Sequence, residues 1–326
     1  MSTLSYATAA HLKYLEKKDI KQEGRSYVNP FFSELEHVEK LREDLEQPEA
    51  SWDLADLIAS GKTFPYNWFG ETRYHIPNNT FLTGFGAIQR LRSAYDFLGG
   101  YYQAAWKNTA KAKECLYLAA YCQEKLCRWP IEDQYRVTEG MVDLNNTNYF
   151  LLGVIANADD ALLESLGELL RMPERNPPKR KRGIALGTGT ILLTFGEDKK
   201  ARKCAERVVA LEEKAKRSTS PWAFYAKGML AVLDRDEVTL NLALEAMVEK
   251  WRRGDTPEVP TLLFPYVAGL AKLAAKRSIP VSVDVLECPK ELIRPEKADY
   301  SHLQLPRPRD GFPWERKPEA YKGEHR

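Results

Sequence analysis

The chain has 326 residues and a formal net charge of +2, with 44% hydrophobic and 29% charged residues. This composition is typical of a globular protein and excludes a collagen-like chain, a disordered chain and a disulfide scaffold. The balanced charge argues against a dedicated nucleic-acid binder, which usually carries a basic excess, and against an acidic mimic of nucleic acid.

Compartment and cofactor use follow from the cysteines and from the absence of long apolar runs. No run reaches the roughly 18 apolar residues that span a membrane, and the first residues show no secretory signal. We therefore expect a cytoplasmic protein without membrane contact. The odd number of cysteines argues against disulfides. No CxxC pair or nearby histidine accompanies them, so we expect buried thiols and neither metal nor cofactor at Cys115, Cys122, Cys127, Cys204 and Cys288.

The N-terminal part of the chain is expected to be helical. Apolar residues at spacings of three and four predict an amphipathic helix over 31–46 that ends at Pro48. Ser51 is expected to cap a second, short helix that ends at Gly61. Residues 62–80 are predicted to form a loop, because prolines, glycine and an Asn-Asn pair interrupt the periodicity.

Further helices are predicted from Thr80 onwards. The pattern is helical from 80 to 128, with a break at Gly99–Gly100 and an end at Pro130. Residues 132–171 are expected to contain one or two helices, the last with an acidic start that suits a helix N-terminus.

A basic, proline-rich stretch at 171–183 is the clearest interruption of the helical pattern in the chain. We place a boundary here, between an N-terminal helical region (1–170) and a C-terminal helical region (184–294). The alternative is a long loop within one continuous helical domain. The residues from 295 to 326 are proline-rich and are expected either to wrap as an ordered tail or to stay partly disordered.

The C-terminal region is read as successive helices. A glycine-containing segment from 183 precedes a polar amphipathic helix over 197–217, and Ser220–Pro221 starts a helix that forms an αα-hairpin with the next one. Another helix is expected over 261–277, followed by a short extended segment, VSVDVL. These elements predict an all-α fold: an irregular, α-solenoid-like array of antiparallel helix pairs with little or no strand.

No stretch carries a recognisable catalytic signature. The glycines of GIALGTGT lack the lysine of a phosphate-binding loop and the preceding strand of a dinucleotide site, so we interpret them as positions of close helix contact. The basic run Lys179–Arg182 is interpreted as a solvated loop that folding does not need, with a partner contact as the alternative. Paired carboxylates fall at helix starts, where the helix dipole explains them. We expect no enzyme activity.

Aromatic residues supply the candidate binding site. Tyr and Trp on a surface are favoured anchors of protein interfaces, although aromatic residues in helical stripes are more often core. The candidate contact residues, the first three of them in the loop over 64–79, are Tyr66, Trp68, Tyr74, Tyr101, Tyr102 and Arg180.

The segment over 222–294 resembles the C-terminal half of the Immunity protein 49 family of bacterial toxin-neutralising proteins. A helix ends at an acidic turn (Asp234, Asp236), an Ala- and Leu-rich helix runs into a charged break, and an apolar helix follows. The stretch then closes with an Arg-x-Ile-Pro-Val step and a Pro-x-x-Leu step, formed by Arg277, Ile279, Pro280, Val281, Pro289 and Leu292.

The resemblance implies a cytoplasmic, all-α protein that binds and blocks a cognate toxin delivered between bacteria by polymorphic or type VI secretion systems. The family has no catalytic residues to transfer, and its members act on a protein partner, with neither nucleic acid nor membrane. Two other hypotheses stay open: a helical-repeat scaffold that binds a protein or peptide, and a helical enzyme with an unrecognised site.

Overall fold

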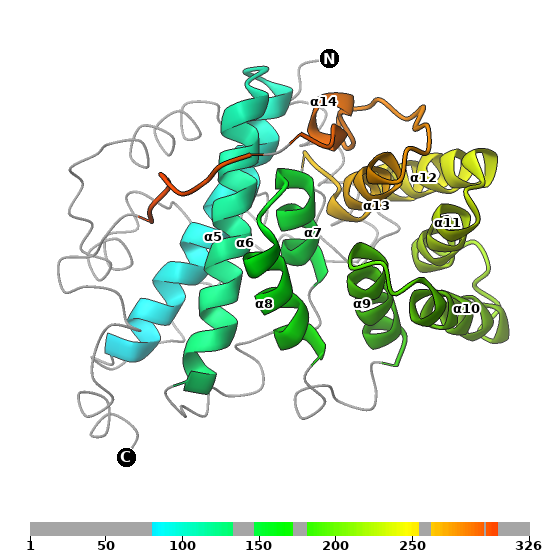
Figure 1. Ribbon diagram of the computed structural model, residues 1–326, viewed down its shortest axis with the longest axis horizontal. Helices are drawn as coiled ribbons and strands as arrows, with labels where there is room; N and C mark the ends of the chain where they lie inside the picture. Colours follow the sequence, from blue (N-terminus) through cyan, green and yellow to red (C-terminus); the bar gives the residue numbers. More distant parts are fainter. Residues whose placement is uncertain (1–79, 133–146, 172–180, 254–261, 297, 306–326) are drawn as a thin grey trace, which may run out of the picture.

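The computed structural model describes residues 80–132, 147–171, 181–253, 262–296 and 298–305. Within these ranges the protein is all-α, and one isolated bridge between Val285 and Cys288 is the only β geometry. The expected array of antiparallel helix pairs is confirmed. The helices, labelled in Figure 1, are α5 (Thr80–Ala104), α6 (Thr109–Glu132), α7 (Thr147–Ala156), α8 (Asp160–Arg171), α9 (Lys181–Thr194), α10 (Asp198–Lys214), α11 (Pro221–Asp234), α12 (Glu237–Arg252), α13 (Pro265–Lys276) and α14 (Lys290–Ile293).

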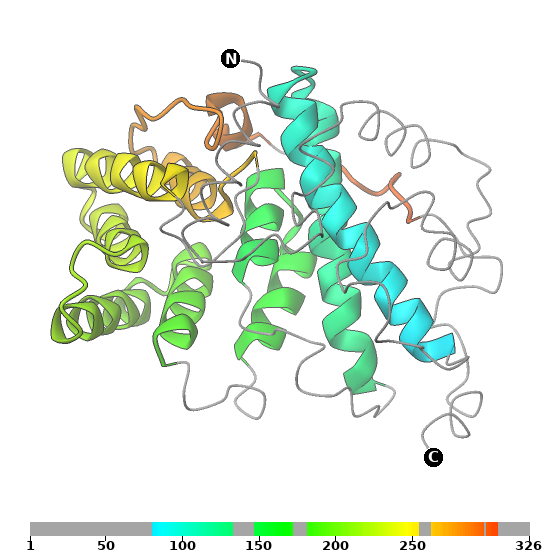
Figure 2. The same cartoon turned by 180° about the vertical axis from the view of Figure 1, so that it is seen from behind.

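The helices form two groups joined by a middle layer. The long helices α5 and α6 lie side by side at one side of the molecule, and α9 to α12 occupy the other side, as Figures 1 and 2 show from opposite directions. Helix α7 contacts α6 on one side and α13 on the other. We call α9 to α12 the α9–α12 group. Helices α7 and α13 therefore share one core between the two groups.

The predicted break at Gly99–Gly100 is wrong, because α5 continues through both glycines to Ala104. A Cβ atom at Gly99 would lie 2.5 Å from Leu116 Cδ2 of α6. The glycine therefore permits close approach of two helices, and its helix-breaking tendency is overridden. The turn falls later, where Lys107 takes a positive φ of 53°, and α6 then runs past Pro130 to Glu132.

Local signals correctly placed the α11–α12 hairpin. Ser220 caps α11 by accepting a hydrogen bond from the Ala223 backbone N–H, with Pro221 at the first helical position. The Asp236 side chain likewise accepts from the Thr239 N–H and caps α12. Between them, Arg235 adopts the left-handed conformation with φ 57°. Helix α11 begins where the sequence predicted, and the predicted hairpin with α12 is confirmed.

The helix expected over 261–277 begins later, at Pro265. Proline lacks a backbone N–H and suits the first helical position, and it restricts the residue before it to extended conformations. Phe264 is accordingly extended, and its backbone N–H donates to the Glu287 carbonyl at 2.9 Å. The predicted extended segment VSVDVL contributes only the isolated bridge.

Close contacts explain two of the three glycines of the GIALGTGT segment in α9. A Cβ atom at Gly189 would lie 2.9 Å from Cys204 Cβ and from Met229 Cε, and one at Gly187 would lie 2.8 Å from Thr147 Cγ2. The interpretation as positions of close helix contact is confirmed for Gly187 and Gly189 and is wrong for Gly183, which has open space around it. The interpretation of the cysteines is also confirmed: all five are free, four are buried and Cys204 is half-buried.

The proline-rich tail lies against α6 and α7 in the part that the structure describes. The Tyr300 ring stacks on Tyr117 with centroids 4.3 Å apart, and its hydroxyl donates to the Ala156 carbonyl. Leu305 is buried as well. The expectation of a wrapped tail therefore holds for 298–305, and 306–326 lie outside the described residues.

Candidate protein interface

Four of the six predicted contact residues, Tyr66, Trp68, Tyr74 and Arg180, lie outside the described residues. So do the predicted helices over 31–46 and 51–60 and the loop over 62–79. Most of the stretch at 171–183 is outside as well, although α9 starts at Lys181 and thus includes its last residues. For these residues the sequence-based expectations stay predictions.

Tyr101 and Tyr102 are buried, so the surface role expected for them needs correction. Their exposed fractions are 1% and 5%. Tyr101 lies 4.9 Å from Phe97, and Tyr102 lies 4.9 Å edge-on to Trp106, both measured between ring centroids. These aromatic side chains fill the space at the α5–α6 turn. The core interpretation, which is the commoner one for aromatic residues in helical stripes, accounts for them.

The basic run Lys179–Arg182 is not wholly a solvated loop. Arg182 belongs to α9, and its guanidinium donates to the fully buried Glu212 carboxylate of α10 at 2.8 Å. Ser220, the cap of α11, donates to the other oxygen at 2.5 Å. Burial works to raise the pKa of Glu212, but the hydrogen bonds from Arg182 and Ser220 outweigh it and lower the pKa. Arg182, one residue of the run, therefore belongs to a buried network that links α9, α10 and the start of α11.

Two large apolar side chains stand exposed on α12. Val238 is 70% exposed and Leu242 is 62% exposed, and they are the only large hydrophobic residues with this exposure in the described ranges. Four residues apart, they lie on one face of the helix, opposite Leu240, Leu244, Met247 and Trp251, which are buried. We call Val238 and Leu242 the α12 apolar pair.

The start of α12 is held rigidly under this pair. Asp236 caps the helix through its hydrogen bonds to Thr239. Asn241 donates to the Pro280 carbonyl at 3.2 Å and accepts from the Ser282 N–H at 2.8 Å, which fastens the first turns of α12 to the segment after α13. The apolar pair is thus presented on a fixed scaffold, which reduces the entropy lost on binding.

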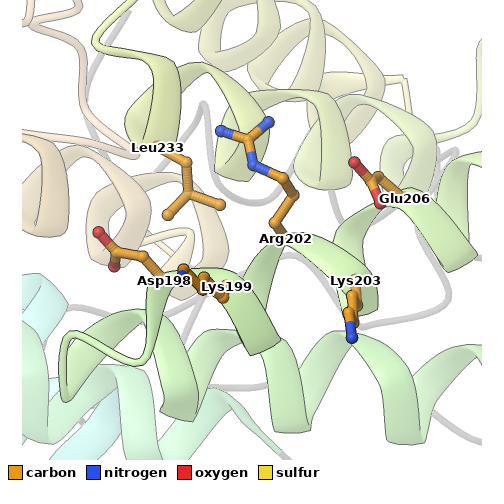
Figure 3. Close-up of a pocket in the computed structure, with 6 residues that line it drawn as sticks. All are labelled: Asp198, Lys199, Arg202, Lys203, Glu206 and Leu233. Carbon is orange, nitrogen blue, oxygen red and sulfur yellow. The ribbon is translucent and has the colours of Figure 1, made fainter.

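A charged hollow lies between α10 and the end of α11 in the same group of helices (Figure 3). It is open to solvent and has a volume of about 510 Å³. Arg202 extends toward Leu233 at the end of α11, and Lys203 extends in the opposite direction. The lining residues are Asp198, Lys199, Arg202, Lys203, Glu206 and Leu233.

Ion pairs fix the charged groups at one edge of this hollow. Arg202 pairs with Asp234 at 2.5 Å, which joins α10 to the end of α11. Arg277 at the end of α13 donates to both Asp198 oxygens, at 3.0 and 2.6 Å, and to the Leu193 carbonyl at 2.9 Å. These pairs orient four helix ends toward one another. These ion pairs hold the charged surface around the hollow in a fixed arrangement.

Two titratable groups with shifted pKa values, half-buried Asp96 and buried Lys272, lie away from this surface. Burial raises the pKa of Asp96 on α5 to about 7, partly offset by Arg92. Burial, assisted by the charges of Lys113 and Lys276, lowers the pKa of Lys272 on α13 to about 7. The Lys272 ammonium donates to the carbonyls of Leu292 and Arg294, so it fastens the segment after α14.

Neither a metal site nor a membrane helix is found in the described part of the chain. No group of three or more His, Cys, Asp or Glu side chains could hold a metal ion there. Likewise, none of the helices in those ranges combines the length and the apolar character that crossing a bilayer requires.

Sequence reasoning missed Val238 and Leu242, although the signal was present. Once α12 is drawn as a helix, its buried apolar residues form one stripe, and this pair falls on the opposite face. An apolar pair off the core stripe is the pattern that marks a contact surface.

Comparison with known proteins gives no match: no known family, no curated protein and no solved structure is similar to this chain. The resemblance to the Immunity protein 49 family therefore stays a prediction.

Proposed function

We propose that this protein is an immunity protein, which binds a cognate antibacterial toxin in the cytoplasm and blocks it sterically. The residues that carry the resemblance, 222–294, coincide with α11 to α14, and the exposed apolar pair belongs to α12. The binding surface thus falls within the segment for which the toxin-neutralising role is inferred.

The observation that carries the proposal is the exposure of Val238 and Leu242 on a rigid helix. Folding gives no reason to place two branched apolar side chains in water one helical turn apart, because α12 already buries a complete apolar stripe. Interfaces commonly have an apolar centre with charged groups around it. The neighbouring turn contributes such charges at Asp234, Arg235 and Asp236, all exposed.

Blocking a toxin requires contact area and shape rather than catalysis. A standard interface covers about 800 Å² on each partner, which is more than one helix face supplies. The apolar pair is the expected anchor, and the hollow beside α10 and the ends of α11 and α13 supply the surrounding contacts. The predicted contacts Tyr66, Trp68, Tyr74 and Arg180 stay candidates for the remaining area.

The proposal is tested by co-expression with the product of the adjacent gene, the place where a cognate toxin is expected. We expect that product to stop growth alone, the full chain to restore growth, and the two to co-elute as a stable one-to-one complex. Absence of toxicity and of a complex would contradict the proposal. It would favour a helical-repeat scaffold, whose binding of short peptides is expected at micromolar strength.

A further inference from the structure

The outer face of α10 carries a row of four basic side chains. Lys199, Lys203, Arg207 and Lys214 are spaced by four, four and seven residues, which places them on one face of a helix. All four are exposed, and the opposite face of α10 is buried through Ala201, Ala205, Val208 and Glu212. We call these four residues the α10 basic row.

The described acidic side chains on and beside α10 form no ion pair with the row. Glu197 pairs with Lys200, Asp198 with Arg277, and Glu212 with Arg182. No cation of the row has an ion-pair or hydrogen-bond partner among the residues that the structure describes. Its positive charge is therefore available to another molecule.

The spacing of the row is unfavourable for the isolated protein. Lys199 and Lys203, and again Lys203 and Arg207, place like charges four residues apart, and such pairs destabilise a helix. An acidic partner would convert this repulsion into attraction.

We propose that the α10 basic row binds an acidic surface of the toxin, an inference that rests on the proposed immunity function. Exposed charges at the edge of an interface mainly accelerate association and set its salt dependence, whereas apolar contacts slow dissociation. The row thus increases the rate at which the toxin associates, and the α12 apolar pair slows the dissociation of the toxin.

Two features favour an acidic protein over nucleic acid as the occupant. Helix α10 contains no aromatic residue on which bases could stack. The net charge of the whole chain is only +2.

A second copy of this chain is the other acidic candidate, because Glu245 and Glu249 lie exposed on α12. An α10-to-α12 contact between copies would cover the apolar pair, which the proposed function assigns to the toxin. The toxin is therefore the occupant that we infer.

The test uses two charge-reversal variants of the full chain. The first is K199E/K203E/R207E in the row, and the control is K107E/K290E/R294E, which changes the net charge equally at exposed residues elsewhere. Association with the product of the adjacent gene is followed at about 50 mM and about 500 mM salt, where the Debye length falls from about 14 to about 4 Å.

We expect the row variant to lower the association rate constant about tenfold or more at low salt and to lose most of its salt dependence. The control should change the rate constant no more than about threefold, and the dissociation rate should stay nearly constant in both. A variant with Gln at the same three positions replaces the row variant if circular dichroism shows that it does not fold.

Other outcomes overturn the inference and separate it from the proposed function. An unchanged association rate in the row variant rejects the inference and leaves the immunity function standing, whereas no complex with the wild-type chain rejects both. Row-dependent binding of a duplex DNA of about 20 base pairs, of the kind that basic surfaces bind, would assign the row to nucleic acid. Salt-sensitive self-association lost in the row variant would assign it to a second copy.

Discussion

Two carboxylates, one on each side of the molecule, have pKa values that are shifted in opposite directions. In the α9–α12 group, Glu212 is fully buried but accepts hydrogen bonds from Arg182 and Ser220, and its pKa is lowered. In the α5–α6 pair, Asp96 is half-buried, and the nearby Arg92 donates to Gln123 and lies over the Tyr149 ring. The pKa of Asp96 is raised to about 7. The pKa of such a carboxylate is lowered where a cation donates hydrogen bonds to it directly, and it is raised where the cation is only nearby.

The largest expected effect comes from breaking a buried pair in the C-terminal half. Glu287 is fully buried and receives two hydrogen bonds from Arg252, at 2.8 and 2.9 Å. Arg252→Ala leaves this carboxylate without its guanidinium and should lower the free energy of unfolding by about 3 kcal/mol. Its neighbour Arg253 pairs with the exposed Glu249, so Arg253→Ala is the control. This substitution should lower the free energy of unfolding by less than about 0.5 kcal/mol. Equal losses in urea unfolding would show that burial does not set the difference.

Close helix contact in the middle layer should give the next effect. A Cβ atom at Gly269 on α13 would lie 2.5 Å from Leu151 Cδ2 and 3.1 Å from Leu151 Cβ on α7. Gly269→Ala should therefore overpack this contact and cost about 2 kcal/mol. Gly183 on α9 has open space around it, and Gly183→Ala should be neutral or stabilise by about 0.5 kcal/mol through helix propensity. Thermal melts that rank the two variants the other way would contradict the observed α7–α13 contact.

The smallest expected effect is the pH dependence that Asp96 contributes. Its pKa is about 7 in the folded state and near 3.8 when unfolded, so the folded state binds more protons between these values. Stability from this group is therefore full at low pH and falls as pH rises toward about 7. Asp96→Asn should remove this slope and stabilise the protein at pH 8 by about 1 kcal/mol. Lys272, whose pKa is lowered to about 7, begins to lose its proton at the upper end of this window, but it does so in the wild type and the variant alike, so the difference between the two proteins reports on Asp96. An unchanged slope between pH 4 and 7 in chemical unfolding would place Asp96 in contact with water.

The same two regions differ in how far the sequence predicts them. The start of α11 was predicted correctly because its signal is local: Ser220 followed by Pro221. Helix α5 was wrongly broken at Gly99–Gly100 because the reason for Gly99 is Leu116, a residue of another helix. Propensity describes a residue alone, whereas contact between helices depends on distant parts of the chain.

The candidate interface shows the same limit. Arg182 was read as part of a solvated run, because nothing nearby in sequence indicates that Glu212 is buried 30 residues later. Tyr101 and Tyr102 were candidates for the surface, and the α5–α6 turn buries them. Val238 and Leu242 were predictable in principle, since their place opposite the buried stripe of α12 follows from helical spacing alone.

The central claim is that the α12 apolar pair anchors a toxin, and growth rescue by V238D/L242D tests it most directly. Both residues are exposed near the start of a helix, where Asp is tolerated, so the fold should persist. The control is A110D/A161D, which places Asp at exposed first-turn residues of α6 and α8. We expect the apolar-pair variant to lose about 100-fold in affinity for the product of the adjacent gene and to fail to restore growth, whereas the control rescues fully. Full rescue by V238D/L242D would contradict the account.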